Sequence, residues 1–247
     1  MMNRIGLGGR LLHLARPLLR LGDVDVSRWS RSYEFQRGRY LRDLGVSVVV
    51  DVGANAGQYG AELRSAGYEG RLLSIEPQEA AYRRLASRCA RDPLWRCLQC
   101  GLGAEAGEAV LKVSANSASS SILPILDLHV EAAPESRYER AERIRVRTLD
   151  SVVREWLEEA WPIGLKLDVQ GYEDRVLNGG AGTLPAVAFL ELELSLIPLY
   201  EGQILANRMI EYLGNRGFVL VNMTPEFSDP RNGRVLQFNG IFLRGRE

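Results

Sequence analysis

The chain has 247 residues, of which 46% are apolar and 25% charged, and this composition predicts one globular domain with a sizeable core. Lys plus Arg and Asp plus Glu both number 31, so the overall charge gives no reason to expect a nucleic acid or another polyanion as partner. Three cysteines, Cys89, Cys97 and Cys100, are too few for a disulfide framework, and a reducing cytoplasm is expected. The Cys97-x-x-Cys100 spacing lacks a second ligand pair nearby, so we expect buried thiols rather than a zinc site.

Residues 1–44 are expected to form a basic helical extension. Leucines alternate with arginines over residues 10–21, an amphipathic pattern far shorter than the roughly 20 apolar residues of a membrane span. Nine arginines and three acids in residues 1–42 suit a peripheral contact with anionic lipid. Pro17 and the nearby glycines favour a helical cap packed on the domain or on a second subunit of a homo-oligomer.

From residue 46 onward, apolar runs alternate with helical patterns, and the β-branched run 46–53 is typical of a strand buried on both faces. The predicted strands are 46–53, 71–77, 95–103, 109–114, 144–150, 164–171, 187–195, 217–223 and 235–244. The predicted helices are 57–67, 79–90, about 149–159, a short one between the strands 164–171 and 187–195, and about 199–215. This alternation predicts the α/β class, an open and mostly parallel sheet with helices on both faces, and the last two strands predict an antiparallel hairpin at one edge.

The turn after the first strand, VGANAG (52–57), is where a ligand is expected, because ligands in such sheets bind beyond the carboxyl ends of the strands. A dinucleotide site needs Gly-x-Gly-x-x-Gly, whereas here Gly53 and Gly57 flank Ala54-Asn55-Ala56. Asp51 would repel a pyrophosphate and attract the ammonium and sulfonium groups of S-adenosylmethionine. The turn therefore predicts S-adenosylmethionine, with the two glycines letting the backbone approach the ligand.

The second strand supports this prediction, because it ends in Glu76, 25 residues after Asp51. A carboxylate at this position can accept hydrogen bonds from both ribose hydroxyls of an adenosyl group. The alternative is that Glu76 only caps the following helix. After the third strand, Gly101, Leu102 and Gly103 are candidates to line the adenine.

The strand 164–171 carries Lys166 and Asp168 on one face, since side chains alternate along a strand. Buried charges cost several kcal/mol unless they are paired. Either the two residues form a structural pair, or Asp168 points at the reacting groups while Lys166 fixes its charge or orients the substrate. Gln170 and Glu173 follow, and they either line the pocket or cap the next helix.

The strand 187–195 places Glu191 and Glu193 on one face in the same way, and Glu193 lies nearer the carboxyl end. Glu193 is therefore the better candidate for the same pocket.

Several stretches resemble the FkbM family of S-adenosylmethionine-dependent methyltransferases. In the family's order they are VVVDVGANAGQYG (48–60), LLSIEPQ (72–78), SASSSILP (117–124), TLDSVV (148–153), LKLDVQGYEDRVLNGG (165–180), ELSLIPLYEG (193–202) and NGIFLR (239–244). The resemblance implies a methyltransferase domain over residues 45–247 with the seven-stranded, Rossmann-like class I fold. It also implies a bacterial setting and methyl transfer to a hydroxyl of a sugar, glycan or polyketide-type metabolite.

The residues expected to bind the cofactor are Asp51, Gly53, Asn55, Gly57, Glu76, Pro77, Gly101, Leu102, Ser120 and Asp168. The expected catalytic residues are Asp168, Glu193 and Lys166. An alcohol is a poor nucleophile, so a base should assist it, with Asp168 as first choice and Glu193 as second. Mg²⁺ held by Asp168 and Glu193 is an alternative.

The segment 115–143 is polar and has little periodicity, which is typical of a pocket-covering loop and of a disordered linker. We favour a loop that orders when substrate binds and that brings Ser120 and Ser121 near the cofactor or acceptor. His129, within this segment, is either a base or a packing residue.

Two other functions stay open. A nicotinamide-dependent sugar dehydrogenase shares the sheet and the ribose acid but needs the third glycine. A non-catalytic adaptor with the same fold would dock through the N-terminal helix.

Overall fold

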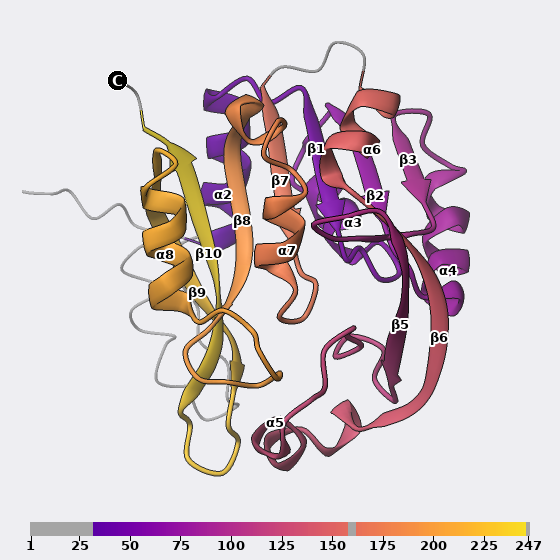
Figure 1. Cartoon of the computed structure of the whole chain (residues 1–247). Coiled ribbons are helices and arrows are strands. Elements are labelled where there is room, and N and C mark those ends of the chain that lie inside the picture. Colours follow the sequence, from indigo (N-terminus) through magenta and orange to yellow (C-terminus); the bar gives the residue numbers. More distant parts are fainter. Residues whose placement is uncertain (1–31, 158–161, 246–247) are drawn as a thin grey trace, which may run out of the picture.

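The computed structural model describes residues 32–157 and 162–245, in which a seven-stranded sheet carries helices on both faces (Figure 1). In chain order the elements are α2 (Tyr33–Asp43), β1 (Val48–Val52), α3 (Gln58–Ser65), β2 (Arg71–Ile75), α4 (Glu79–Cys89), β3 (Trp95–Leu98), β4 (Gly101–Leu102), β5 (Gly107–Ser114), α5 (Asp127–Ala132), a 3₁₀-helix (Pro134–Ser136), β6 (Tyr138–Arg147), α6 (Leu149–Trp156), β7 (Ile163–Leu167), α7 (Glu173–Asn178), a second 3₁₀-helix (Leu184–Ala186), β8 (Val187–Ser195), α8 (Ala206–Gly214), β9 (Phe218–Ser228) and β10 (Val235–Arg244). The predicted α/β class is confirmed.

The strand order of the main sheet is β3-β2-β1-β7-β8-β10-β9. Neighbours from β3 to β8 pair in parallel, whereas β10 runs antiparallel to both β8 and β9. The predicted C-terminal hairpin is therefore confirmed, with β9 at the edge of the sheet. The chain reverses its direction of travel across the sheet between β1 and β7, which is where a parallel sheet opens a crevice for a ligand.

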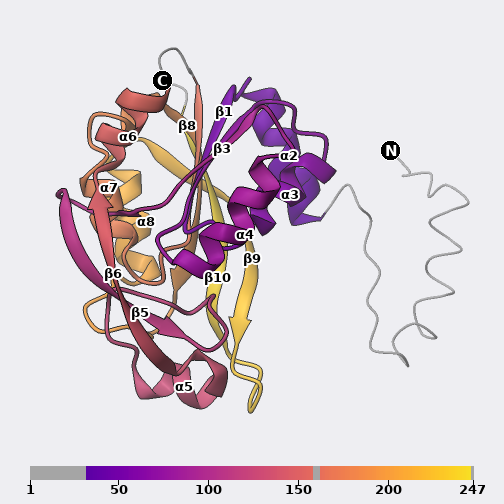
Figure 2. The same ribbon diagram turned by 90° about the vertical axis from the view of Figure 1, so that its right-hand side faces the viewer.

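The two faces of the sheet are covered by different helices. Figure 2 shows α2, α3 and α4 on one face and α6, α7 and α8 on the other. Val48, Val49 and Val50 of β1 are all fully buried, since Val49 packs with Leu41 of α2 and Leu63 of α3 while its neighbours pack in the opposite layer. The prediction of a strand buried on both faces is confirmed.

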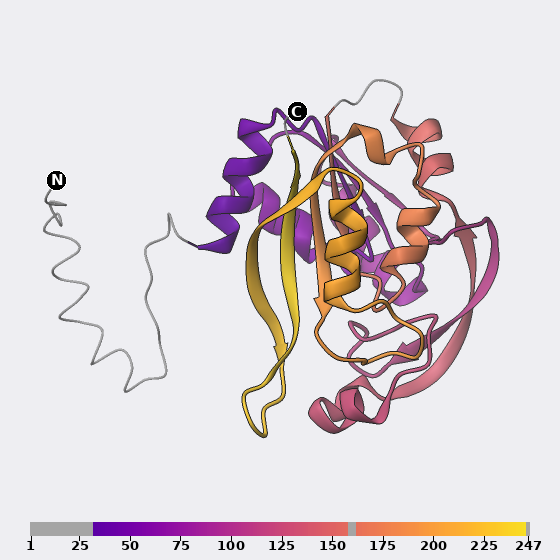
Figure 3. The same ribbon diagram turned by 60° about the vertical axis from the view of Figure 1, so that its left-hand side comes forward.

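Helix α2 lies within the expected N-terminal extension, and Figure 3 shows it beside β9 and β10. It begins after Ser32, whose side chain accepts a hydrogen bond from the backbone N–H of Phe35. Arg37 and Leu41 are its buried residues. The amphipathic pattern over residues 10–21 lies outside the described residues. No helix in the described part of the chain has the length and apolarity that a membrane crossing needs.

The third predicted strand, 95–103, is wrong as a single element, because the chain changes sheets within it. Trp95–Leu98 pairs with β2, whereas Gly101 pairs with Val146 of β6. β4, β6 and β5 form a second, three-stranded sheet near the carboxyl ends of the main strands (Figure 1). Alternation predicts that a segment is extended, but it does not identify the partner strand.

The segment 115–143 contains more regular structure than its weak periodicity indicates. It contains α5, the first 3₁₀-helix and the beginning of β6. The outer residues of β6 are mostly charged and exposed, as in Glu139, Arg140 and Arg143, so that hydrophobic periodicity is weak there.

The last predicted helix, 199–215, begins later than expected, at Ala206. The Gln203 side chain accepts hydrogen bonds from the backbone N–H groups of Leu199 and Tyr200. Gly202 adopts a φ of +70°. These features form a turn where a helix was predicted.

Candidate functional site

A pocket of about 440 Å³ lies at the carboxyl ends of β1, β2, β7 and β8, with the second sheet forming its other wall. This volume suits a small-molecule ligand. All the predicted cofactor-binding and catalytic residues except Gly57 line it: Asp51, Gly53, Asn55, Glu76, Pro77, Gly101, Leu102, Ser120, Lys166, Asp168 and Glu193. Residues separated by more than 140 positions in the sequence are thus brought together.

The glycines of the first turn are required by the protein's own packing. Gly53 has a φ of +80°, and a Cβ there would lie 1.8 Å from the carbonyl oxygen of Asp168. Gly57 has a φ of +84°, and a Cβ there would meet Leu85 at 3.0 Å and Trp95 at 3.2 Å. The backbone that approaches Gly53 so closely is the end of β7, while Gly57 faces the core.

The turn after β1 has few free backbone donors. The N–H groups of Gly53 and Ala54 both donate to the carbonyl of Ile75, at 2.9 and 3.1 Å. The N–H of Asn55 donates to Glu76 Oε2 at 2.8 Å. A turn that binds a pyrophosphate needs such N–H groups to face the ligand.

Glu76 is anchored at both carboxylate oxygens, because its Oε1 accepts from the backbone N–H of Gln78 at 2.8 Å. Gln78 precedes the first residue of α4, so the capping alternative holds in part. Each oxygen retains a lone pair for a ligand hydroxyl. Burial raises the pKa of Glu76 to about 7, against the opposing effect of the two backbone N–H groups.

A row of polar side chains crosses the sheet beneath the pocket. Strand register places Asp51 beside Ser74 on one side and Lys166 on the other, and Lys166 beside Glu191. Ser74 Oγ donates to Asp51 Oδ2 at 3.2 Å. Burial raises the pKa of Asp51 to about 7, although Lys166 and Ser74 both act to lower it.

Lys166 and Asp168 form an ion pair, with 3.6 Å between Nζ and Oδ2. The lysine side chain is 7% exposed and the aspartate side chain 38% exposed, so Asp168 is the member that faces the pocket. Burial by itself lowers the pKa of Lys166, but Asp168, Glu191 and the neighbouring acids outweigh it and raise the pKa. The lysine therefore stays charged and orients its partner.

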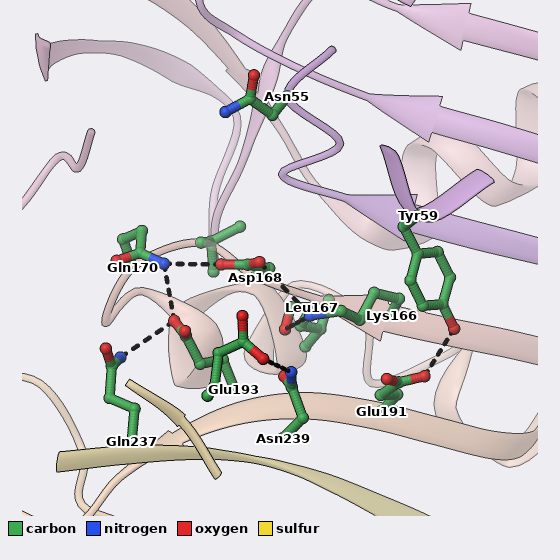
Figure 4. A network of polar contacts seen from close by, with 12 residues as sticks. Asn55, Tyr59, Lys166, Leu167, Asp168, Gln170, Glu191, Glu193, Gln237 and Asn239 are labelled. Carbon is green, nitrogen blue, oxygen red and sulfur yellow. Dashed lines mark hydrogen bonds and ion pairs between the residues drawn. The ribbon is translucent and has the colours of Figure 1, made fainter. Parts of the chain in front are cut away.

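Glu191 is held by residues that the sequence did not indicate. Tyr59 Oη donates to Glu191 Oε2 at 2.7 Å (Figure 4). Arg37 Nη1 lies 3.6 Å from Glu191 Oε1. Arg37 also pairs with Glu62 at 3.0 Å and lies over the Tyr59 ring. In the sequence, Arg37 is one of many arginines in a basic stretch, so no local signal distinguishes it.

Gln170 joins the two candidate catalytic acids. Its Nε2 donates to Asp168 Oδ1 and to Glu193 Oε2, both at 2.7 Å, and Gln237 Nε2 donates to the same Glu193 oxygen at 3.0 Å (Figure 4). Burial, reinforced by Asp168, raises the pKa of Glu193 well above its ordinary value. Glu173 is not among the pocket-lining residues, and its Oε1 accepts from the backbone N–H groups of Val169 and Gly171 in the loop before α7.

The Mg²⁺ site considered for Asp168 and Glu193 is not supported. The amide nitrogen of Gln170 donates to both carboxylates, and a donor in that place competes with a cation for the same oxygens. Among residues 32–157 and 162–245, no group of three or more His, Cys, Asp and Glu side chains could hold a metal. The side chains at this position therefore do not fit Mg²⁺.

One end of the pocket is apolar. Leu102 of β4, Leu111 of β5, Ile144 of β6 and Ile122 all line it there. The second sheet supplies most of this wall, which the sequence analysis did not predict. An aromatic base fits such a wall better than a charged group does.

Acids dominate the rest of the pocket. The acidic residues among its described lining are Glu34, Asp51, Glu62, Glu76, Asp168, Glu191, Glu193 and Glu226, whereas the basic ones are Arg37 and Lys166. Both basic side chains are already paired with carboxylates. A cationic ligand is therefore favoured over an anionic one.

The serines and the histidine predicted from the segment 115–143 have different surroundings. Ser120 and Ser121 line the pocket, and Ser121 Oγ donates to the carbonyl of Gln170 at 2.7 Å. His129 is buried between Tyr200 and Phe227, with ring centroids 5.2 and 5.1 Å away. Burial lowers the pKa of His129 to about 4, which agrees with the packing alternative.

The strand order, the reversed β10 and the pocket at the β1–β7 crevice together define a Rossmann-like class I methyltransferase fold. The methyltransferase FkbM domain matches residues 51–220, which is more than half of the chain. The chain belongs to the FkbM methyltransferase family.

Solved structures are similar to this chain at low sequence identity. A putative methyltransferase from Thermobifida fusca YX has 14% identity and a TM-score of 0.50, with 96% of this chain and 87% of that chain covered. Methyltransferase FkbM from Methylobacillus flagellatus KT has 15% identity and a TM-score of 0.46, with 78% of this chain covered, and the match spans 43% of that chain. Burkholderia thailandensis 1,6-didemethyltoxoflavin-N1-methyltransferase, solved with S-adenosylhomocysteine, has 13% identity and a TM-score of 0.44, with 100% and 92% of the chains covered. No curated protein matches the chain.

Proposed function

We propose that this chain is an S-adenosylmethionine-dependent O-methyltransferase. The observation that carries the proposal is the pocket's charge, with eight acidic residues facing two paired basic ones. S-adenosylmethionine has an ammonium, a sulfonium and no phosphate, and it therefore fits a pocket lined mainly by carboxylates. When bound, it supplies an electrophilic methyl group.

The residues have distinct roles in cofactor binding. Asp51 attracts the methionyl ammonium, directly or through a water, while Glu76 accepts hydrogen bonds from the ribose hydroxyls. Gly101 and Leu102 form part of the adenine wall. The remaining members of the predicted set shape the pocket: Gly53, Asn55, Pro77 and Ser120.

Asp168 is the proposed general base, since it is the most exposed of the central carboxylates and lies beside Lys166. It accepts the proton of the acceptor hydroxyl, and such assistance typically contributes about 10²- to 10⁴-fold. Lys166 orients Asp168. Glu193 is the second candidate; it is buried, and its Oε2 already accepts hydrogen bonds from the Gln170 and Gln237 amides. Alignment of the hydroxyl within the pocket can contribute about 7–11 kcal/mol more.

The proposed acceptor is a hydroxyl of a sugar, glycan or polyketide-type metabolite. Tyr33, Thr224 and Asn239 form a polar wall on the side away from the apolar end. The paired state of Arg37 and Lys166 leaves no free cation in the described lining to meet a phosphate backbone. This supports a small neutral acceptor over a nucleic acid.

The two alternatives have less support. A nicotinamide dinucleotide needs the turn's N–H groups, of which those of Gly53, Ala54 and Asn55 are engaged by the protein. A non-catalytic adaptor has no need of the buried Lys166–Asp168 pair. We also propose a cytoplasmic location. The proposed domain boundary lies between residues 44 and 45, and the N-terminal extension before it is proposed to serve in docking or oligomerisation.

The test is calorimetry with S-adenosylmethionine, S-adenosylhomocysteine and NAD, followed by incubation with methyl-labelled cofactor and a panel of glycans and hydroxylated metabolites. We expect both sulfur nucleosides to bind, NAD not to bind, and label to enter a hydroxyl compound. Binding of NAD alone would contradict the proposal.

A further inference from the structure

The backbone of Gln170 is held in an uncommon conformation directly after the proposed base. Gln170 has a φ of +52°, a region that few residues other than glycine adopt. Gly171 follows with a φ of +91°, and a Cβ there would lie 3.1 to 3.2 Å from Gln203, Leu123 and Tyr200. The turn is therefore closely packed, and the Gln170 side chain leaves it in a defined direction.

The Gln170 amide is oriented by Tyr200. Tyr200 Oη donates to Gln170 Oε1 at 2.6 Å. The amide nitrogen of Gln170 therefore faces Asp168 and Glu193 (Figure 4). A primary amide has one acceptor oxygen and two N–H donors, and all of them are engaged here. The reversed amide would place its oxygen against two carboxylates. The phenol hydroxyl thus selects one of two orientations.

Tyr200 is itself rigidly placed. It is fully buried, and it packs in a cluster with Leu123, Leu199 and Leu236. Its hydroxyl lies 3.2 Å from the carbonyl of Ser119, farther than from the Gln170 oxygen. Its position therefore follows from core packing, as a positioning group requires.

We propose that Gln170, oriented by Tyr200, is a positioning residue that holds the Asp168 carboxylate toward the reacting centre. Oδ1 of Asp168 is held by the Gln170 amide and Oδ2 by Lys166. Because the Asp168 side chain is 38% exposed, loss of the amide leaves only the 3.6 Å pair with Lys166 to oppose its rotation toward solvent. This inference rests on the proposed function, since it takes Asp168 to face the transferable methyl group.

The test needs no acceptor. S-adenosylmethionine and S-adenosylhomocysteine share the ammonium and the nucleoside but differ in the charge at sulfur, so the ratio of their affinities reports the electrostatic field there. The Asp168→Asn variant measures how far this ratio shifts when the charge of the carboxylate is removed. We expect Gln170→Met and Tyr200→Phe to shift it in the same direction as Asp168→Asn, by about threefold to tenfold.

Tyr138→Phe is the matched control. It removes another phenol hydroxyl of the same region, which donates to the carbonyl of Leu123 at 2.8 Å and does not contact the Gln170 side chain. We expect it to keep the wild-type ratio. A purely structural role would lower both affinities together without moving their ratio.

Three results would overturn the inference. The first is a wild-type ratio in Gln170→Met and Tyr200→Phe while Asp168→Asn changes it. The second is an unchanged ratio in Asp168→Asn. The third is that the wild-type protein binds neither nucleoside. Only this third result also refutes the proposed function, since wild-type binding is intact in the first two. If Tyr200→Phe does not fold, Gln170→Met decides.

Discussion

Asp51 and Lys166 are direct partners on adjacent parallel strands, and both side chains are almost fully buried beneath the pocket. Because the two side chains lie next to each other on one face of the sheet, removing either charge leaves the other buried with one partner fewer, which is unfavourable in a low-dielectric environment. The charge of the lysine is shared with Asp168 on its own strand and with Glu191 on the next.

Asp51→Asn should weaken binding of S-adenosylmethionine by about 10- to 100-fold, because it removes a charge-assisted contact to the ammonium. The fold should persist, since Lys166 keeps Asp168, Glu191 and Glu193 as acidic neighbours. Calorimetry measures the affinity. Glu79→Gln removes an equal charge outside the pocket lining and should bind normally.

Asp168→Asn should lower turnover by about 10²- to 10⁴-fold while changing the affinity for S-adenosylmethionine by no more than about tenfold. Single-turnover kinetics with a labelled methyl group separates the two effects. Asp174→Asn, on α7 and paired with Arg175, is the control. Equal loss of binding and turnover in a folded Asp168 variant would rule out the assigned role.

The stability of the ligand-free protein should fall as pH rises. Burial raises the pKa of Asp51 and of Glu76 to about 7, above their values in an unfolded chain. Between those unfolded values and pH 7 the native state therefore binds more protons than the unfolded state, and the free energy of unfolding decreases with pH. Urea unfolding at a series of pH values measures this slope, which should flatten in Asp51→Asn/Glu76→Gln.

Asp51 and Glu76 should also make cofactor binding depend on pH, because they lose protons when a cationic ligand binds. A cationic ligand favours the ionised carboxylates, so binding near pH 6 should release protons and weaken as pH falls. Calorimetry in buffers of different ionisation enthalpy counts the protons. Proton uptake at this pH would contradict the placement of these acids beside a cation.

Gly53→Ala should prevent folding or destabilise the protein by more than about 3 kcal/mol, because a Cβ at Gly53 would lie 1.8 Å from a backbone oxygen. Gly67→Ala is the matched control, since Gly67 has a similar φ of +85° and no atom within 4 Å of its Cβ position. We expect it to cost about 1 kcal/mol. Denaturant unfolding measures both, and equal costs would show that backbone strain alone decides.

Arg37→Met should destabilise the protein by about 3–5 kcal/mol, because it leaves the buried Glu191 without its guanidinium partner. Arg39→Met, on the same helix, removes only an exposed pair with Asp43 and should cost less than about 0.5 kcal/mol. If the two variants unfold at the same urea concentration, the buried pair does not matter.

Much of the main sheet could be predicted, because its strands are continuous apolar runs that end at charged or turn residues. β8 agrees with its prediction, and β1 differs by a few residues at its ends. The second sheet could not be predicted, because β4 has only two residues and its pairing with β6 leaves no periodic signal in the sequence.

The sequence by itself determined the residue types of the pocket, since an acid that ends a buried strand is visible as a charge after an apolar run. Asp51, Glu76, Asp168 and Glu193 were all identified in this way. Only the tertiary structure decided how these acids are arranged. Arg37, Gln170 and Tyr200 act through contacts with residues at distant positions or through one specific rotamer, and such contacts depend on three-dimensional packing that no local pattern encodes.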